Sequence, residues 1–323
     1  MFSSIKYRFE KKVQSFENSV LILCYHRVGE NINDLWANSV SVENFKDQMD
    51  HLSSNYNILS IEELYGQYSK GKILNHRNIV ITFDDGYEIN TNYSLNILDS
   101  LKIPSTFYMN TYMLGTNEHF WWDELQLIFS KSNSLPSKLV IKMYENEIVF
   151  PLNNDNNILF TIQTIHRFLK GQESLVRKEI LNAISEQVPI TDEPSDEIKP
   201  VTERGILQTA SNELFTIGGH THSHNSISLL DEKSQLDEIR TNKNILEELI
   251  SNKIKHFSYP FGGRADYDNC TIRIIKNLEY LTAVTTNKSP FRYTSSIYEI
   301  PRFSIKNWSK DVFSNKINNY FNF

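Results

Sequence analysis

The 323-residue chain has no apolar run long enough to cross a membrane, little cysteine and no excess of basic residues. A transmembrane helix needs about 18 or more apolar residues in succession, so a spanning protein is excluded. The two cysteines, Cys24 and Cys270, rule out a disulfide scaffold and favour reduced, buried thiols over a disulfide between them. The formal net charge of −6 gives no electrostatic reason to expect nucleic acid as a partner.

The first residues of the chain also lack a secretory signal. Residues 1–16 mix charged and aromatic side chains and contain no apolar core of the roughly 7–15 residues that export requires. We therefore expect a cytoplasmic protein. Apolar and basic residues interleave between Phe2 and Phe16, which leaves two alternatives open: a peripheral membrane-surface helix, or a helix packed on its own domain.

What the sequence does contain is a regular alternation of buried strands and amphipathic helices. With 40% hydrophobic and 22% charged residues, the chain can bury a full core. Short apolar runs predict strands at 20–25, 78–83 and 105–109, and apolar periodicity predicts helices at 41–52, 61–68 and 93–101. This order predicts an α/β fold with a parallel sheet or barrel.

The alternation of predicted strands and helices is interrupted between residues 118 and 204. A helix around 120–129, a hairpin around Glu145 and Asn146, and a largely helical stretch at 158–184 predict an α+β insertion. Strands at 214–217, 256–259, 281–285 and 297–303 and helices near 236–250 and 271–277 then resume the first pattern. The predicted organisation is an N-terminal segment (1–19), a barrel (20–117 and 205–323) and an insertion (118–204).

Two adjacent carboxylates, Asp84 and Asp85, follow the predicted strand at 78–83. Neighbouring carboxylates at a strand end repel each other unless a cation or a basic group lies between them, so we expect positive charge nearby. The alternative is a simple turn in which one aspartate caps the next helix.

Two histidines, His220 and His224, stand four residues apart after two glycines at another strand end. On one helical turn this spacing would place both imidazoles on a single metal ion, with His222 facing away. Two imidazoles and one carboxylate, with one position left for water, are typical of catalytic rather than structural zinc. We therefore expect a divalent metal, with zinc as the expected ion.

Three short motifs together carry a resemblance. TFDDG (82–86), HTHSH (220–224) and SYPFG (258–262) resemble the first three motifs of the polysaccharide deacetylase family, the NodB-homology group or carbohydrate esterase family four. The similarity covers about 20–115 and 205–303. It implies a distorted (β/α) barrel with fewer than eight full repeats and an active site at the carboxyl ends of the strands.

The resemblance also implies roles for individual residues. Asp84 would be the general base, and Asp85, His220 and His224 would be the metal ligands. In SYPFG, Tyr259 and Phe261 would contact the substrate, Phe261 through a backbone N–H that stabilises the oxyanion.

The sequence departs from the family pattern at two places. Ser258 stands where many members have an arginine that pairs with the base; Arg302 is our candidate replacement and Arg264 the second, with a surface arginine as the alternative for each. No histidine follows His256, although many members use a late histidine as general acid. His26, after the first strand, is the candidate acid, and a structural histidine is the alternative. The pair Tyr25–His26 resembles the subgroup that acts on poly-N-acetylglucosamine, in which a Tyr-His pair opens the domain.

Trp121 and Trp122 open the insertion and could either stack on sugar rings or pack the insertion onto the barrel. The expected activity is hydrolysis of the N-acetyl amide of an amino sugar, in a glycan or in a lipid- or nucleotide-linked precursor. An O-acetyl esterase, a sugar deformylase and a non-catalytic carbohydrate-binding barrel are the alternatives. The sequence does not identify the sugar.

Overall fold

The computed structural model describes residues 19–30, 34–71, 77–116, 118–132, 134–188 and 196–321. The chain divides into two compact units: a first unit, Met1–Tyr112 with Val201–Phe323, and a second unit, Met113–Pro200. The second unit begins and ends slightly earlier than the predicted insertion. The predicted membrane-surface helix lies outside the described residues. Within those residues, none of the helices is long and apolar enough to span a membrane.

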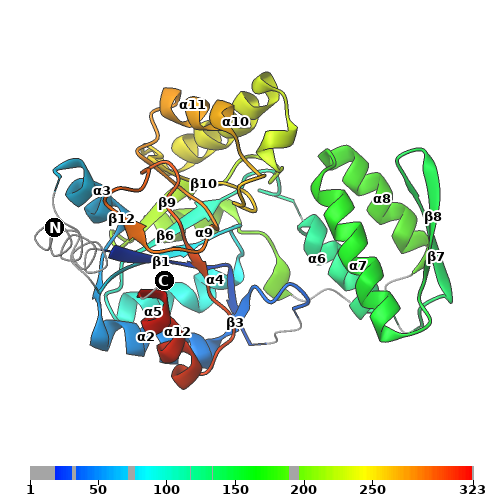
Figure 1. Ribbon diagram of the computed structural model, residues 1–323, viewed down its shortest axis with the longest axis horizontal. Coiled ribbons are helices and arrows are strands. Elements are labelled where there is room, and N and C mark those ends of the chain that lie inside the picture. The colour runs from blue at the N-terminus through cyan, green and yellow to red at the C-terminus, as the bar shows by residue number, and fades with distance from the viewer. Residues whose placement is uncertain are drawn as a thin grey trace, which may run out of the picture. The chain divides into compact units, whose positions relative to one another are not determined.

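A curled, mostly parallel sheet forms the centre of the first unit (Figure 1). All of its strands pair in parallel except β1 with β12. This arrangement confirms the predicted α/β class and distorted (β/α) barrel. The strand order is β11 (Thr282–Val284), β10 (His256–Ser258), β9 (Phe215–Gly219), β6 (Ser105–Met109), β5 (Asn78–Phe83), β1 (Ser19–Tyr25) and β12 (Phe291–Arg292), with β4 (Asn57–Ile58) beside β5 and β13 (Phe303–Ser304) beside β1.

Strand alternation decides which side chains point into the curled sheet. On β1 and β5, Ile22 pairs with Val80 and Cys24 with Thr82, so these four residues belong to alternate, same-facing positions. Toward the start of the strands this face is apolar and joins one buried cluster with residues of β6, β11 and α3 (Ile61–Ser69). Toward the strand ends it becomes polar, and the next position on the same face after Thr82 is Asp84. The fold therefore directs Asp84 into the mouth of the barrel.

Helices cover the outside of the curled sheet. Figure 1 shows α10 and α11 on one side of it and α2, α5 and α12 on the other. Side-chain caps define several helix starts, among them Ser41 before α2 and the Ser60–Glu63 capping box before α3. The helices are α2 (Val42–Asn55), α3 (Ile61–Ser69), α4 (Ile89–Asn92), α5 (Ser94–Ser100), α9 (Glu203–Ala210), α10 (Glu232–Ile250), α11 (Asn269–Asn277) and α12 (Lys310–Phe321).

One predicted strand is not continuous. The stretch 297–303 makes only a single bridge, from Ile300 to Val284, before the short strand β13. The reason is that this stretch crosses from β11 to β1 and changes its pairing partner on the way. Arg302, which lies on this crossing, is fully buried.

The second unit contains helices and one hairpin, as the sequence predicts: α6 (Trp121–Ser130), β7 (Lys138–Met143), β8 (Asn146–Pro151), α7 (Asp155–Lys170) and α8 (Ser174–Gln187). Trp121 and Trp122 are only 6% and 7% exposed. Trp122 stacks on Phe120, and Trp121 packs against His166 and Arg177. Little indole surface remains for a sugar, and these contacts are all with residues of the second unit itself. The structure therefore argues against the substrate-binding role predicted for this pair and favours packing within the second unit.

Candidate functional site

The three motifs meet at the carboxyl ends of β5, β9 and β10, and their backbones are strained there. Four motif residues that are not glycine have left-handed backbone conformations: Asp85 (φ 73°), Thr221 (φ 62°), His224 (φ 53°) and Phe261 (φ 60°). Each such conformation costs on the order of 1–3 kcal/mol and persists only where the surroundings enforce it. The helical turn predicted for HTHSH is therefore wrong: an irregular loop, with Thr221 and His224 left-handed, brings the two histidines together.

Asp85, His220 and His224 form one buried cluster. The Oδ1 atom of Asp85 lies 3.3 Å from Nε2 of His220 and 3.2 Å from Nε2 of His224. One potential ligand atom from each residue lies within 4.8 Å of the other two. Donor atoms of a tetrahedral zinc site, with bonds of about 2.0–2.1 Å, lie about 3.3 Å apart. The spacing in the cluster fits such a site.

The hydrogen bonding of His220 explains why the cluster needs a cation. Its Nδ1 lies 2.8 Å from the carbonyl oxygen of Ser258, which can only accept, so Nδ1 carries a proton. In a neutral imidazole Nε2 then presents a lone pair to the Asp85 carboxylate, which is also an acceptor. Either a second proton or a metal ion must lie between them. An imidazole fixed by a backbone carbonyl, with its other nitrogen toward the ion, is the usual geometry of metal-ligating histidine.

The electrostatics of the cluster agree with this reading. Burial by itself would raise the pKa of Asp85, but hydrogen bonds from His220 and His224 hold it well below its ordinary value. Burial would lower the pKa of His220, yet the hydrogen bond to Asp85 raises it. The carboxylate therefore stays ionised and attracts positive charge. These residues fit a divalent cation such as zinc.

Arg302 provides the positive charge expected beside Asp84. Its Nη1 donates to Oδ1 of Asp84 at 2.7 Å and its Nη2 to Oδ2 at 2.5 Å, a bidentate pair in which Arg302 is fully buried. The guanidinium also donates to the carbonyl of Thr285 and to the hydroxyls of Thr82 and Ser258. The small Ser258 leaves room for Arg302, and its hydroxyl donates to Asp84 at 3.1 Å.

This pair fixes the charge state of Asp84. Burial would raise the pKa of its carboxyl group, but the charge and hydrogen bonds of Arg302 lower the pKa to about 2. Asp84 is therefore ionised at every physiological pH. Its two oxygens are oriented by Arg302 next to the Asp85 cluster.

His26 lies beside the same carboxylate. Potential ligand atoms of Cys24, His26 and Asp84 lie within 4.8 Å of one another. These residues do not suit a second metal ion, because Asp84 is already bound by Arg302 and burial raises the pKa of the Cys24 thiol well above its ordinary value. The backbone carbonyl of His26 accepts a hydrogen bond from Asn90, which fixes the start of this loop.

The remaining predicted residues divide into two groups. The ring of Phe261 packs 4.8 Å from that of His224, so the third motif borders the cluster. Tyr259, in contrast, is fully buried and its hydroxyl donates to the carbonyl of Tyr298. The prediction that the Tyr259 side chain contacts the substrate is therefore wrong. Arg264, the second candidate partner of Asp84, is exposed. His222 contacts Thr111 and Tyr112 and stays out of the metal cluster.

Asn242 is a site residue that the sequence analysis missed. It is fully buried on α10, accepts a hydrogen bond from the backbone N–H of His220 and donates to the carbonyl of Met109. A signal was present, because Asn242 occupies a position on the apolar stripe between Ile239 and Leu246 where an apolar residue would be expected. Gly219 leaves space for it: a Cβ there would lie 2.7 Å from Oδ1 of Asn242.

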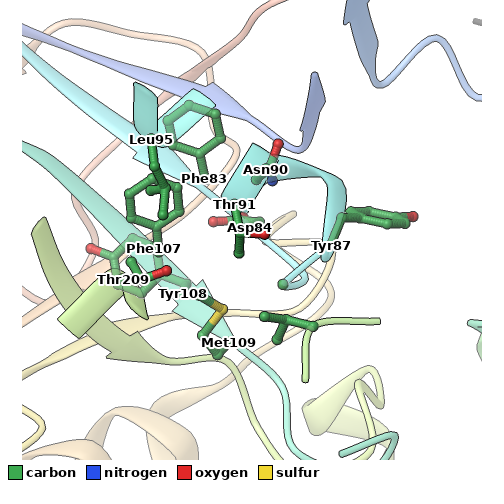
Figure 2. Close-up of a pocket in the computed structure, with 12 residues that line it drawn as sticks. Phe83, Asp84, Tyr87, Asn90, Thr91, Leu95, Phe107, Tyr108, Met109 and Thr209 are labelled. Carbon is green, nitrogen blue, oxygen red and sulfur yellow. The ribbon is translucent and has the colours of Figure 1, made fainter. Parts of the chain in front are cut away.

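A small cavity lies behind the Asp84–Asp85 turn. Figure 2 shows Asp84 among the other residues that line it, between Phe83, Tyr87, Thr91 and Met109. Its volume of about 10 Å³ is close to that of one water molecule and too small for an acetyl group.

Comparison with known proteins agrees with this geometry. The sequence profile of the polysaccharide deacetylase family matches residues 71–148 and 184–283, more than half of the chain. The chain belongs to this family. This match confirms the family resemblance of the three motifs. As a member of the family, the protein is a hydrolase that acts on a sugar acetyl group. No curated protein matches the sequence.

Solved structures of deacetylases share the fold. IcaB from Ammonifex degensii matches with a TM-score of 0.61 and 15% identity, over 94% of this chain and 97% of IcaB. A polysaccharide deacetylase from Bacillus cereus matches with a TM-score of 0.60 and 18% identity, over 94% and 70%. The deacetylase PplD from Streptococcus pyogenes, in complex with acetate, matches with 0.56 and 17%, over 94% and 98%. These matches establish the fold of the polysaccharide deacetylase family for nearly the whole chain.

Proposed function

We propose that this polysaccharide deacetylase is a metal-dependent amidase that removes the N-acetyl group from an amino sugar, in a glycan or in a lipid- or nucleotide-linked precursor. One observation carries the proposal: Asp85, His220 and His224 converge on a single point beside a second carboxylate, Asp84, that is held ionised. Three protein ligands with a base next to them are the arrangement of a catalytic rather than a structural metal site.

Each residue then has a chemical task. A divalent cation held by the three ligands would polarise the acyl carbonyl and lower the pKa of a nearby water molecule. Asp84 accepts a proton from the attacking water, and Arg302 keeps its carboxylate ionised and oriented. The backbone N–H of Phe261 stabilises the negative charge that develops on the carbonyl oxygen.

The position of His26 beside Asp84 supports an amide substrate, because an amide needs a general acid for its leaving group. Hydrolysis joins the water oxygen to the acyl carbon, breaks the C–N bond and delivers one proton to the departing nitrogen. A sugar amine is a poor leaving group until it is protonated, whereas an alcohol leaves more readily, so an amidase needs a general acid. His26, beside Asp84, is the residue we assign to this step.

The test measures acetate released from N-acetylated amino-sugar oligomers and from O-acetylated sugars, with zinc and with a chelator. We expect zinc-dependent release from the amides, and Asp84→Asn should lower kcat by about 100-fold or more while zinc stays bound. His26→Gln should slow amide hydrolysis much more than ester hydrolysis. Zinc-loaded protein that releases acetate only from esters would overturn the amide assignment.

A further inference from the structure

The chain leaves the first unit after Tyr112 and returns to it at Val201. Residues 110–112 follow β6 and form the outgoing connection to the second unit, and residues 201–202 form the return connection, directly before α9. The chemistry above assigns no role to either connection. Both are hydrogen-bonded to the loops that carry Asp85, His220 and His224.

The outgoing connection holds the loop between the two histidines of the metal cluster. The carbonyl oxygen of His222 accepts the backbone N–H of Thr111 at 3.2 Å and that of Tyr112 at 2.8 Å. The hydroxyl of Thr111 lies 2.9 Å from Nδ1 of His222, and Thr111 is buried. The middle histidine of HTHSH, which stays out of the metal cluster, therefore binds the segment that leads to the second unit.

Asn242 joins the outgoing connection to His220. Its side-chain amide donates to the hydroxyl of Thr111 at 3.3 Å, and its side-chain carbonyl accepts the backbone N–H of His220 at 3.1 Å. Asn110, on the same connection, donates to the backbone carbonyl of Asp85 at 2.8 Å. Thr111, Asn110 and Asn242 thus link this connection to the strand ends that carry His220 and Asp85.

The return connection holds the turn after Asp85. The backbone N–H of Val201 donates to the carbonyl of Gly86 at 2.8 Å, and that of Thr202 donates to Oε2 of Glu88 at 2.7 Å. Gly86 has a left-handed φ of 82°, and a Cβ there would lie 3.2 Å from the side chain of Val201. The turn and the return connection are therefore packed too closely to accept a larger residue at position 86 without displacement.

We propose that Thr111 and Glu88 are positioning residues of the metal site, through which metal binding is coupled to the ordered conformation of both connections. Because these connections attach the second unit, its attachment becomes part of what holds the metal ligands in place. The coupling rests on the metal site of the proposed function, but not on the choice of an amide substrate.

The strain in the ligand loops gives the physical reason for this coupling. The left-handed conformations of Asp85, Thr221 and His224 persist only where surrounding contacts enforce them, and the connections supply such contacts. A metal ion that binds the enforced conformation must, by linkage, stabilise the contacts that enforce it by the same factor. Loss of an outer hydrogen bond around a metal site typically lowers metal affinity by about 10–100-fold.

Removing the hydroxyl of Thr111 tests the outgoing connection. Thr111→Val keeps the size of the side chain but removes its bonds to His222 and Asn242, and exposed Thr116→Val is the matched control. In a zinc titration of chelator-treated protein, we expect Thr111→Val to bind zinc about tenfold more weakly than wild type. Thr116→Val and Thr111→Ser, which restores the hydroxyl, should bind within about twofold of wild type.

The rescue by Thr111→Ser separates a positioning role from a general loss of structure. Equal zinc affinity in wild type and Thr111→Val would overturn the role of Thr111. Equal weakening in Thr111→Val and Thr111→Ser would do the same, because the hydroxyl would then not be the cause.

Glu88 tests the return connection. Glu88→Ala removes the acceptor for the N–H of Thr202, Glu88→Gln keeps a neutral acceptor, and exposed Glu248→Ala on α10 is the control. We expect zinc affinity about tenfold lower in Glu88→Ala, and within about twofold of wild type in the other two variants. An unchanged zinc affinity in Glu88→Ala would overturn the role of this connection.

Hydrogen exchange measures the reciprocal effect in the wild-type protein, without any substitution. Zinc at about 100 times its dissociation constant should slow exchange of the backbone N–H groups of Thr111, Tyr112, Val201 and Thr202 by about tenfold or more. The N–H groups of the β7–β8 hairpin, inside the second unit, should exchange at an unchanged rate. Equal exchange rates at both connections with and without zinc would overturn the coupling.

The coupling and the proposed function fail in different ways. Wild-type protein that binds zinc but releases no acetate from any amide would refute the amidase function, while zinc affinities and exchange rates still decide the coupling. Zinc-dependent acetate release, with wild-type zinc affinity in both Thr111→Val and Glu88→Ala, would refute the coupling alone. Wild-type protein that binds no zinc would refute both.

Discussion

Replacing Arg302 by methionine should destabilise the protein in a way that depends strongly on pH. In the wild type, the pKa of Asp84 is about 2 against an ordinary value of 3.8, which corresponds to about 2 kcal/mol of stabilisation. Because the folded-state pKa lies below the unfolded-state value, this stabilisation is present above about pH 4 and is lost as the pH falls toward 2.

Arg302→Met reverses the sign of this contribution. Burial then raises the pKa of Asp84 with no guanidinium to oppose it, so ionised Asp84 becomes a buried, unpaired charge. Breaking a buried ion pair in this way costs about 3–5 kcal/mol near neutral pH. The cost should shrink as the pH falls below the raised pKa, because the neutral acid is tolerated in the site.

The assay is urea unfolding of chelator-treated wild type and variant at pH 7.5, 5.5 and 4. The difference in free energy of unfolding should be largest at pH 7.5 and smallest at pH 4. Asp84→Asn/Arg302→Met removes both charges and should be more stable than Arg302→Met at pH 7.5. A difference that is the same at all three pH values, or a double variant no more stable than Arg302→Met, would mean that the cost does not come from an ionised, unpaired Asp84.

Further predictions concern the metal cluster. Asn242→Leu removes the acceptor for the His220 backbone, so zinc affinity should fall by about 10–100-fold; unchanged affinity in a zinc titration would contradict a positioning role. Gly219→Ala pushes a Cβ into Asn242 and should weaken zinc binding in the same direction, whereas Gly66→Ala, at a position with open space, should not. Zinc affinity should also fall with decreasing pH. Burial lowers the pKa of His220, but its bond to Asp85 raises it overall, so protons compete with the ion at higher pH than for a free imidazole.

Much of the site could be predicted because its residues follow buried strands. The apolar run at 78–83 fixes a strand, strand alternation fixes the face of Asp84, and parallel strands bring their carboxyl ends to one edge. Because the third motif has Ser258 in place of an arginine, another arginine could be predicted to pair with Asp84. Arg302 forms this pair.

Other features depend on long-range packing that local sequence does not encode. The HTHSH loop has a helix-like spacing but left-handed residues, and hydrogen bonds from His222 and Ser223 to Glu238 on α10 hold it in place. Tyr259 belongs to a conspicuous motif yet packs in the core against Phe257 and Tyr267. The burial of Trp121 and Trp122 depends on side chains up to 56 residues away, such as Arg177. A motif indicates chemistry, but only the tertiary structure shows which of its side chains reach the site.

If Asp85, His220 and His224 bind one catalytic divalent ion beside the base Asp84, zinc binding and acetate release must occur together. The most direct measurement is a zinc titration of chelator-treated protein that follows bound zinc and acetate release from an N-acetylglucosamine pentamer together. We expect acetate release to rise in step with one equivalent of zinc per chain, and Asp84→Asn to bind the same zinc without releasing acetate. Full acetate release before any zinc is bound, or undiminished release by zinc-loaded Asp84→Asn, would contradict it.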